Sequence, residues 1–442
     1  MRNTPPPPGS SWQPDPRQSG GRETSANPDE QAWAWPPGTP AASAQPAQAW
    51  AWPPPAERCR PPRPSGPALP RPGSAYHRMG HTWRHRWWIP IVAFIFAAAL
   101  YLLVQTIMGV AAAIIAALHG HRFSPESPLG ATVPDLVFLL VTISLMTPVV
   151  MLAVRLIQRR PVGTLISVEG RMRWRWLLVC MLAALPVLAV FTAALYVLQR
   201  LTAPGEAFVA DFGGGAAFIP ALVAIVLLVP FQASAEEFAL RGFLLQLVGG
   251  YGAEPGERRG DGAWAAFLRT PVLGIIITTA VFTSLHEYTG WGLVNVALLG
   301  AGLAWLTWYT GGLEAAIALH VLHNMLVFSI SAYEGTLDAA ARGPGSWEGV
   351  VGTAVEVGLF ILVVVWLVRR LGIRRTAPGD AAESLPGAPP RGPAPSRPLR
   401  PRPGGPAPGL GGRGTPGAAG LSGSQGTMGG HAHPPPADPG TP

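Results

Sequence analysis

The sequence predicts an all-α fold, a polytopic membrane bundle of about eight transmembrane helices between two disordered tails rich in Pro and Gly. Three observations support this prediction. Hydrophobic residues make up 48% of the 442-residue chain, and they are concentrated in its middle. The apolar stretches there are long enough to cross about 30 Å of hydrocarbon as helices. Arginines gather in alternate connections between these stretches, which is typical of multi-pass membrane proteins.

The two ends of the chain differ in composition from its middle. Residues 1–84 and 373–442 are dominated by small residues and Pro and lack apolar periodicity. Such segments cannot bury enough apolar surface to offset the entropy lost on ordering. A near repeat, Gln-Ala-Trp-Ala-Trp-Pro-Pro, begins at Gln31 and again at Gln48. We therefore expect two disordered tails and one packed domain, residues 85–372.

Eight apolar stretches define the expected helices of this domain. They cover about residues 88–118, 133–154, 176–198, 217–248, 272–289, 292–309, 313–331 and 349–368. The fourth stretch differs from the others because Glu236, Glu237 and Arg241 lie well inside it. It is also too long for one straight span.

Arginine placement predicts the orientation of the bundle. The arginine-rich segments precede the first stretch, separate the second from the third and the fourth from the fifth, and follow the eighth. Both termini are therefore expected to be cytoplasmic in a cell membrane. The net charge of +8 is then explained by topology and by contact with the lipid bilayer, and nucleic acid is not expected as a partner. The absence of Lys and the abundance of Arg, Ala, Gly and Pro suggest a bacterial source with GC-rich codons.

The charged residues of the fourth stretch mark a candidate functional site. A charged side chain at membrane depth costs roughly 2.5 to 3.5 kcal/mol, so such groups usually face the bundle interior and carry function. Glu237 and Arg241 are four residues apart and are expected to form a structural ion pair. Glu236 points about 100° away around the helix and has no expected local partner. That arrangement is typical of a carboxylate reserved for chemistry.

Further polar residues reach a similar depth in later stretches. His286 ends the fifth stretch, and His320 and Asn324 share one face of the seventh. Counting the helical rise of 1.5 Å per residue brings these three side chains and Glu236 to about one level. His323 points to another face from Asn324, and we expect it to be a packing or lipid-facing ring.

These residues resemble three ordered motifs, EExxxR, FxxxH and HxxxN, of the CPBP family of CAAX-processing prenyl endopeptidases and bacteriocin-processing or immunity proteins. The resemblance covers approximately residues 215–330, and the motif residues are Glu236, Glu237, Arg241, Phe282, His286, His320 and Asn324. It implies a membrane-embedded endopeptidase that acts on a membrane-associated peptide or protein. It also implies that Glu236 is the catalytic glutamate, that His286 helps to hold the water, and that His320 and Asn324 stabilise the oxyanion.

A metal remains open at this stage. Glu236, His286 and His320 could hold a divalent metal such as zinc with water as the fourth ligand. The same side chains could instead organise water by hydrogen bonds, and the compact His-Glu-x-x-His pair of many metalloproteases is absent because position 290 is Gly290. No other cofactor site is expected. A metal-dependent endopeptidase and a metal-independent one thus both fit the sequence.

Two functions of other classes are alternatives. A non-catalytic membrane scaffold or bacteriocin-immunity-type protein would use the same polar residues to hold helices together. An ion-coupled transporter would also place carboxylates and histidines at membrane depth, but the chain shows no evident internal repeat. Neither alternative explains the order of the three motifs.

Overall fold

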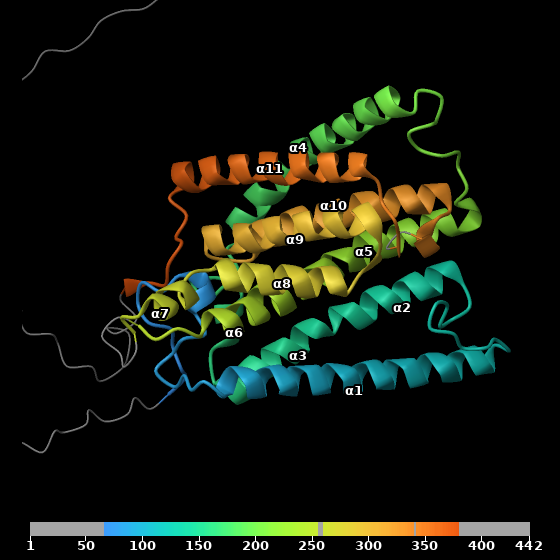
Figure 1. Cartoon of the computed structure of the whole chain (residues 1–442). Helices are drawn as coiled ribbons and strands as arrows, with labels where there is room; N and C mark the ends of the chain where they lie inside the picture. Colours follow the sequence, from blue (N-terminus) through green and yellow to red (C-terminus); the bar gives the residue numbers. More distant parts are fainter. Residues whose placement is uncertain (1–65, 255–259, 340–341, 380–442) are drawn as a thin grey trace, which may run out of the picture. The chain divides into compact units, whose positions relative to one another are not determined.

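A computed structural model describes residues 66–254, 260–339 and 342–379 (Figure 1). Within these residues about 71% of the chain is helical. Its one pair of two-residue strands, β1 (Glu287–Tyr288) and β2 (Arg342–Gly343), is parallel. The predicted all-α polytopic fold class is therefore confirmed. The Trp-Pro repeat and most of both predicted tails lie outside the described residues.

Seven helical segments in the described part of the chain are long and apolar enough to cross a membrane. They are α1 (Ile89–Leu118), Thr132–Gln158, α4 (Trp174–Thr202), Gly215–Gly249, α9 (Gly290–Thr310), α10 (Glu314–Glu334) and α11 (Trp347–Leu371). Each corresponds to an expected stretch.

The remaining expected stretch, residues 272–289, differs from the prediction. It forms α8 (Val272–Ser284), whose 13 residues rise only about 20 Å, less than the hydrocarbon thickness. The helix ends before β1 because the chain there pairs with β2 instead of continuing as a helix.

The segment that carries the charged motif is a composite helix. It begins with a 3-10 turn, η4 (Gly215–Ala217), and α5 (Phe218–Glu237), and it ends with a π-helix, η5 (Phe238–Leu244), and α6 (Leu245–Gly249). The whole segment has 35 residues and spans about 52 Å, which is more than a bilayer core requires. The π-helix starts directly after the paired glutamates. Such turns interrupt α-helices frequently at functional sites.

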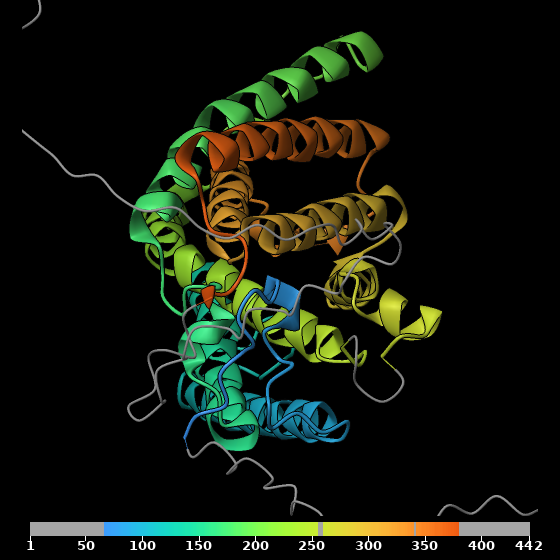
Figure 2. The same cartoon turned by 90° about the vertical axis from the view of Figure 1, so that its left-hand side faces the viewer.

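Helix α10 is the most enclosed of the spans. Of its most apolar stretch 56% is buried, compared with 11% for α1. It packs against α5, α4 and α9, and α11 packs on both α4 and α9. Segment Thr132–Gln158, composed of α2 (Thr132–Ser144), α3 (Met146–Ala153) and a π-helix η2 (Val154–Gln158), lies beside α5 and α1. Figure 2, seen along the bundle, shows α1 in blue and α4 in green at opposite edges.

The arginine-rich segments meet at one end of the bundle, on the left in Figure 1, which we call the arginine end. Arg78 donates hydrogen bonds to the carbonyls of Gly249, the last residue of α6, and Gly252, which lies just beyond it. Arg160 donates to the carbonyl of Met79 and to the side chain of Gln246. The chain before α1 also pairs with the chain after α11, where the amide of Ala377 donates to the carbonyl of Ser74. These contacts bring together the four arginine-rich segments. The predicted topology places all four on the same side of the membrane.

The predicted tail boundaries are wrong for residues 66–84 and 373–379. Tyr76 and Met79 are fully enclosed, and the Tyr76 hydroxyl donates to the carbonyl of Leu165. The short 3-10 turn η1 (Tyr76–Arg78) lies so close to α6 that a Cβ on Gly249 would come within 2.1 Å of the carbonyl oxygen of His77. This segment is held by side-chain bonds to distant backbone rather than by a periodic apolar face, so its composition did not reveal it.

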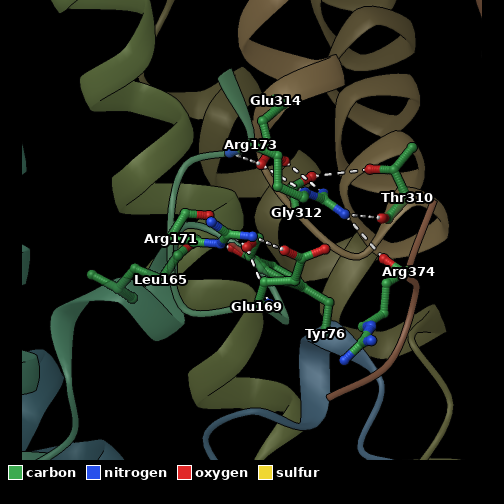
Figure 3. Close-up of polar contacts among 10 residues, drawn as sticks. Tyr76, Leu165, Glu169, Arg171, Arg173, Thr310, Gly312, Glu314 and Arg374 are labelled. Carbon is green, nitrogen blue, oxygen red and sulfur yellow. Dashed lines mark hydrogen bonds and ion pairs between the residues drawn. The ribbon is translucent and has the colours of Figure 1, made fainter. Parts of the chain in front are cut away.

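A buried ion pair anchors α10 at the arginine end (Figure 3). Arg173 Nη2 lies 2.7 Å from Glu314 Oε2, and the Nε and backbone amide of Arg173 donate to Glu314 Oε1. The second terminal nitrogen of Arg173 donates to the carbonyls of Thr310 and Arg374. One guanidinium thus ties the starts of α4 and α10 to the chain after α11.

Candidate active site

A cavity of about 390 Å³ lies among α5, α8, α9 and α10, beside α2. Its polar lining includes all four predicted catalytic residues, Glu236, His286, His320 and Asn324. Its apolar lining comes largely from α2, α3, α9 and α10, and includes Leu139, Leu140, Ile143, Met146, Val296, Leu299, Val327 and Phe328. The structure therefore brings together the side chains that the helical rise placed at one level, whereas their catalytic roles stay predictions.

Glu237 and Arg241 form an ion pair beneath the cavity. Arg241 Nη1 lies 2.8 Å from Glu237 Oε1, and both side chains are 0% exposed. Arg241 also donates to the carbonyl of Gly300 on α9, and its guanidinium carbon lies 4.4 Å from the centre of the Phe282 ring. A Cβ on Gly300 would lie 2.8 Å from that ring, so this approach of α9 requires glycine. The pair is therefore sealed by a backbone carbonyl and an aromatic face.

His320 lies between the two glutamates. Its Nδ1 is 2.8 Å from Glu237 Oε1, and its Nε2 is 3.4 Å from Glu236 Oε2. The ionised Glu237 accepts a hydrogen bond from Arg241 through the same oxygen, so Nδ1 of His320 carries the proton that it shares with Glu237. The Nε2 atom is then the one that faces Glu236 and the cavity.

Glu236 has a local partner that the sequence reading missed. Gln232, one turn earlier on α5, donates from Nε2 to Glu236 Oε1 at 2.8 Å. Asn324 donates in turn to Gln232 Oε1 at 3.3 Å. The other oxygen, Glu236 Oε2, has no hydrogen-bond donor within the described residues. The expectation of an unpartnered carboxylate is therefore wrong for one oxygen, while the second is left without a donor.

The signal that could have revealed Gln232 was present. It is a polar residue in the apolar run, four positions before Glu236, and this spacing places both on one helix face.

His286 lies at the same cavity, just beyond the end of α8. Its Nδ1 is 2.7 Å from the carbonyl oxygen of Phe282, so this nitrogen donates and Nε2 is free to accept. The Phe282 ring contacts His286 with a centre-to-centre distance of 4.6 Å and His320 with 5.7 Å. Within the described residues His286 makes no direct contact with Glu236, so any cooperation between them passes through a molecule in the cavity.

The charges of this cluster are nearly balanced. Glu236 and Glu237 carry two negative charges when ionised, and Arg241 carries one positive charge. One additional proton, shared by Glu236 and His320, makes the buried group neutral and lowers the cost of desolvation.

The candidate metal ligands do not fit a metal in this arrangement. In the described part of the chain, no three His, Cys, Asp or Glu side chains come close enough to hold a metal ion. The set Glu236, His286 and His320 is included in this result. The geometry instead matches a network in which both imidazoles donate from Nδ1, and in which Nε2 of His320 faces Glu236 while Nε2 of His286 stays free to bind a molecule in the cavity.

His323 also differs from the expectation. It is neither a simple packing ring nor a lipid-facing one, because it lines the cavity and its Nδ1 lies 3.0 Å from both carboxylate oxygens of Glu356 on α11. Sequence spacing did not indicate this pair, since its two residues lie on different helices.

The fold and the site together define a polytopic helical protein with a buried acid–histidine cluster at an internal cavity. Residues 215–326, which include every motif residue, match the family described as "Type II CAAX prenyl endopeptidase Rce1-like". The chain is also 29% identical over 229 residues to "Uncharacterized protein YyaK" of Bacillus subtilis (strain 168), which covers 50% of this chain and 71% of that protein. No solved structure matches it significantly.

The predicted family resemblance is therefore confirmed, and residues 215–326 form an Rce1-like domain. The match to a membrane protease family, together with the seven apolar helices, identifies a multi-pass membrane protein and supports a membrane endopeptidase in general.

Proposed function

We propose that this protein is an intramembrane endopeptidase of the CAAX-protease type, which hydrolyses a peptide bond near the membrane surface with water activated by Glu236. The observation that carries the proposal is the state of Glu236 Oε2. This oxygen belongs to a cavity-lining carboxylate, has no hydrogen-bond donor in the described part of the chain, and lies 3.4 Å from a histidine nitrogen. A general base needs such a free oxygen beside a group that can share its proton.

The first chemical step is attack on the scissile carbonyl. Glu236 Oε2 takes a proton from water while the water oxygen bonds to the carbonyl carbon and the C=O π electrons move to the oxygen. His286 is suited to orient the water because its Nε2 can accept a hydrogen bond. His320 Nε2–H and the Asn324 amide are suited to donate to the developing oxyanion.

The second step is collapse of the tetrahedral intermediate. The carbonyl reforms, the C–N bond breaks, and Glu236 returns its proton to the leaving amine, so that protons balance over the cycle. Glu237 supports both steps by holding the Nδ1 proton of His320 at 2.8 Å, which orients the ring. Arg241 supports them indirectly by keeping Glu237 ionised.

The bilayer setting follows from the same proposal. We place the chain in the cell membrane with both termini cytoplasmic, on the basis of the arginine end, and we expect a membrane-associated peptide or protein as substrate. The competing scaffold function predicts that the polar network only joins helices, as the Asn324 to Gln232 bond does.

The test compares peptides released from membranes that contain the wild-type protein or the Glu236→Gln variant at equal abundance. The proposal expects a set of new peptide termini with the wild-type protein that is missing with the variant. Gln keeps the shape and the bond to Gln232 but cannot take a proton. Identical peptide profiles would instead favour the scaffold function.

A further inference from the structure

A second histidine–carboxylate pair lies at the reaction cavity, outside the groups that the proposed mechanism uses. His323 is three residues after His320 on α10 and adjacent to Asn324, and all three line the same cavity. Spacings of three and four residues bring side chains together on one helix face. The cavity is therefore lined by three polar side chains of α10.

Glu356, the partner of His323, is an enclosed acid within a membrane helix. Its side chain is 0% exposed, and that of His323 is 11% exposed. Within residues 66–254, 260–339 and 342–379, His323 is its only ionic partner. A carboxylate at such depth is costly unless it is paired, so the pair is a functional candidate by default.

Within the described residues, no other charged side chain forms an ion pair or a side-chain hydrogen bond with His323 or Glu356. The Phe191 ring of α4 packs on His323 with a centre-to-centre distance of 5.8 Å. Thr353, one turn before Glu356 on α11, has a hydroxyl without a hydrogen-bond partner in the described structure.

The geometry defines which nitrogen of His323 serves the cavity. Nδ1 lies 3.0 Å from each carboxylate oxygen of Glu356, so it carries a proton and is occupied. A second ring proton makes the buried pair neutral overall and turns Nε2 into a charge-assisted donor. His323 then offers one donor to the cavity, and Glu356 fixes the plane of its ring.

A peptide bound in the cavity can use such a donor. A peptide bound there brings main-chain carbonyls, and each carbonyl that is buried without a donor is unfavourable. The walls formed by Leu139, Leu140 and Val327 cannot donate. In the proposed mechanism His320 and Asn324 donate to the oxyanion, so a carbonyl away from the scissile bond needs another donor.

We propose that His323 is a substrate-binding residue, which donates a hydrogen bond from Nε2 to a main-chain carbonyl oxygen of the bound peptide, and that Glu356 is its positioning residue. This inference rests on the proposed endopeptidase function and adds a contact away from the scissile bond. It assigns the pair to ground-state binding rather than to proton transfer.

The kinetic test uses the full-length protein in proteoliposomes and internally quenched peptides that it cleaves in a Glu236-dependent manner. His323→Phe keeps a ring of similar size without either nitrogen, and Glu356→Gln keeps an acceptor for Nδ1 without the charge. We expect KM to rise about 10- to 100-fold in His323→Phe, the range for loss of a hydrogen bond to a charged donor, with kcat changed less than about threefold. Glu356→Gln should show a smaller rise in KM, and His323→Gln, which retains an amide donor, should recover part of the loss.

Thr353→Val is the matched control, because it changes a buried polar residue one turn from Glu356 and leaves the pair intact. Its KM should equal that of the wild-type protein. An unchanged KM in His323→Phe at wild-type thermal stability would overturn the inference, as would a fall in kcat alone.

A binding measurement separates this inference from the hydrolytic function. Fluorescence anisotropy of short dye-labelled apolar peptides is recorded with Glu236→Gln protein, alone and combined with His323→Phe. Binding that weakens at least tenfold on loss of His323 supports the inference even if the wild-type protein cleaves nothing. Binding that does not depend on His323, or no binding at all, contradicts it, while Glu236-dependent cleavage would still support the proposed function.

Discussion

Two buried acid–arginine pairs in this protein look alike but leave different atoms unsatisfied. At the arginine end, Arg173 and Glu314 satisfy each other, and both oxygens of Glu314 accept hydrogen bonds. Glu237 and Arg241 are more enclosed than that pair, and within the described residues Glu237 Oε2 and Arg241 Nε have no hydrogen-bond partner. The neighbouring Glu236 also keeps one oxygen without a donor there, and of these three residues it is the one that lines the cavity. Burial of an ion pair therefore indicates a structural constraint, whereas an unsatisfied oxygen at a cavity indicates chemistry.

The largest expected effect is on stability, and it concerns the pair at the cavity. Glu237→Gln or Arg241→Ala leaves one charged partner in a fully enclosed site, which costs about 3–5 kcal/mol. We expect a lower melting temperature in detergent for each single variant, measured by thermal unfolding at equal protein concentration. Wild-type melting of both variants would mean that the two side chains are solvated.

A smaller effect, chiefly on the rate, is expected for the oxyanion donors. His320→Ala and Asn324→Ala should each lower turnover about 10²- to 10³-fold, the usual effect of removing one donor to an oxyanion. Peptide cleavage at saturating substrate measures this effect, with folded protein quantified in parallel. A loss of less than about tenfold in either variant would remove that residue from the proposed oxyanion site.

The sequence was sufficient for the features that depend on local spacing. The i and i+4 spacing of Glu237 and Arg241 and the depth of His320 and Asn324 follow from helix geometry, so these residues could be placed before the structure was known. The contact of His323 with Glu356 could not be placed, because it depends on how α10 packs against its neighbours. Residues 66–84 were misjudged because their burial depends on single bonds to distant backbone, such as that of Arg78 to Gly249.

At the arginine end, we expect stability to depend modestly on pH because of His77. Burial lowers the pKa of His77 from 6.5 to about 4, and the charge of Arg78 acts in the same direction, against the hydrogen bond to the Arg269 carbonyl. The folded protein thus keeps His77 neutral where the unfolded chain takes up a proton. This contribution to stability is present above about pH 6.5 and is lost as the pH falls toward about 4.

The expected loss is of order 1–3 kcal/mol, to be measured by thermal unfolding across this pH range. His77→Gln, which retains a donor for the Arg269 carbonyl but does not titrate, should show a flatter dependence. Equal pH dependence in both proteins would contradict the assignment to His77.

The smallest effect is expected for the first 65 residues. Their removal keeps the hydrogen bonds described for the segment that begins at Pro67, such as that from the amide of Ala68 to the carbonyl of Arg159, so thermal stability and peptide cleavage should both stay at wild-type levels. Extending the deletion to residue 78 removes Tyr76 and Arg78 and should destabilise the arginine end. Loss of cleavage in the shorter deletion, with intact folding, would show that these residues deliver or gate the substrate.

The most direct test of the account sets Glu236→Gln against Glu314→Gln in purified protein reconstituted into liposomes. Cleavage of an internally quenched peptide is measured per folded molecule, and melting temperature is measured alongside. The account predicts that Glu236→Gln abolishes cleavage with little change in melting, and that Glu314→Gln lowers melting while the remaining folded protein still cleaves. Full activity of Glu236→Gln at wild-type stability would contradict the assignment of Glu236 as the base that activates water.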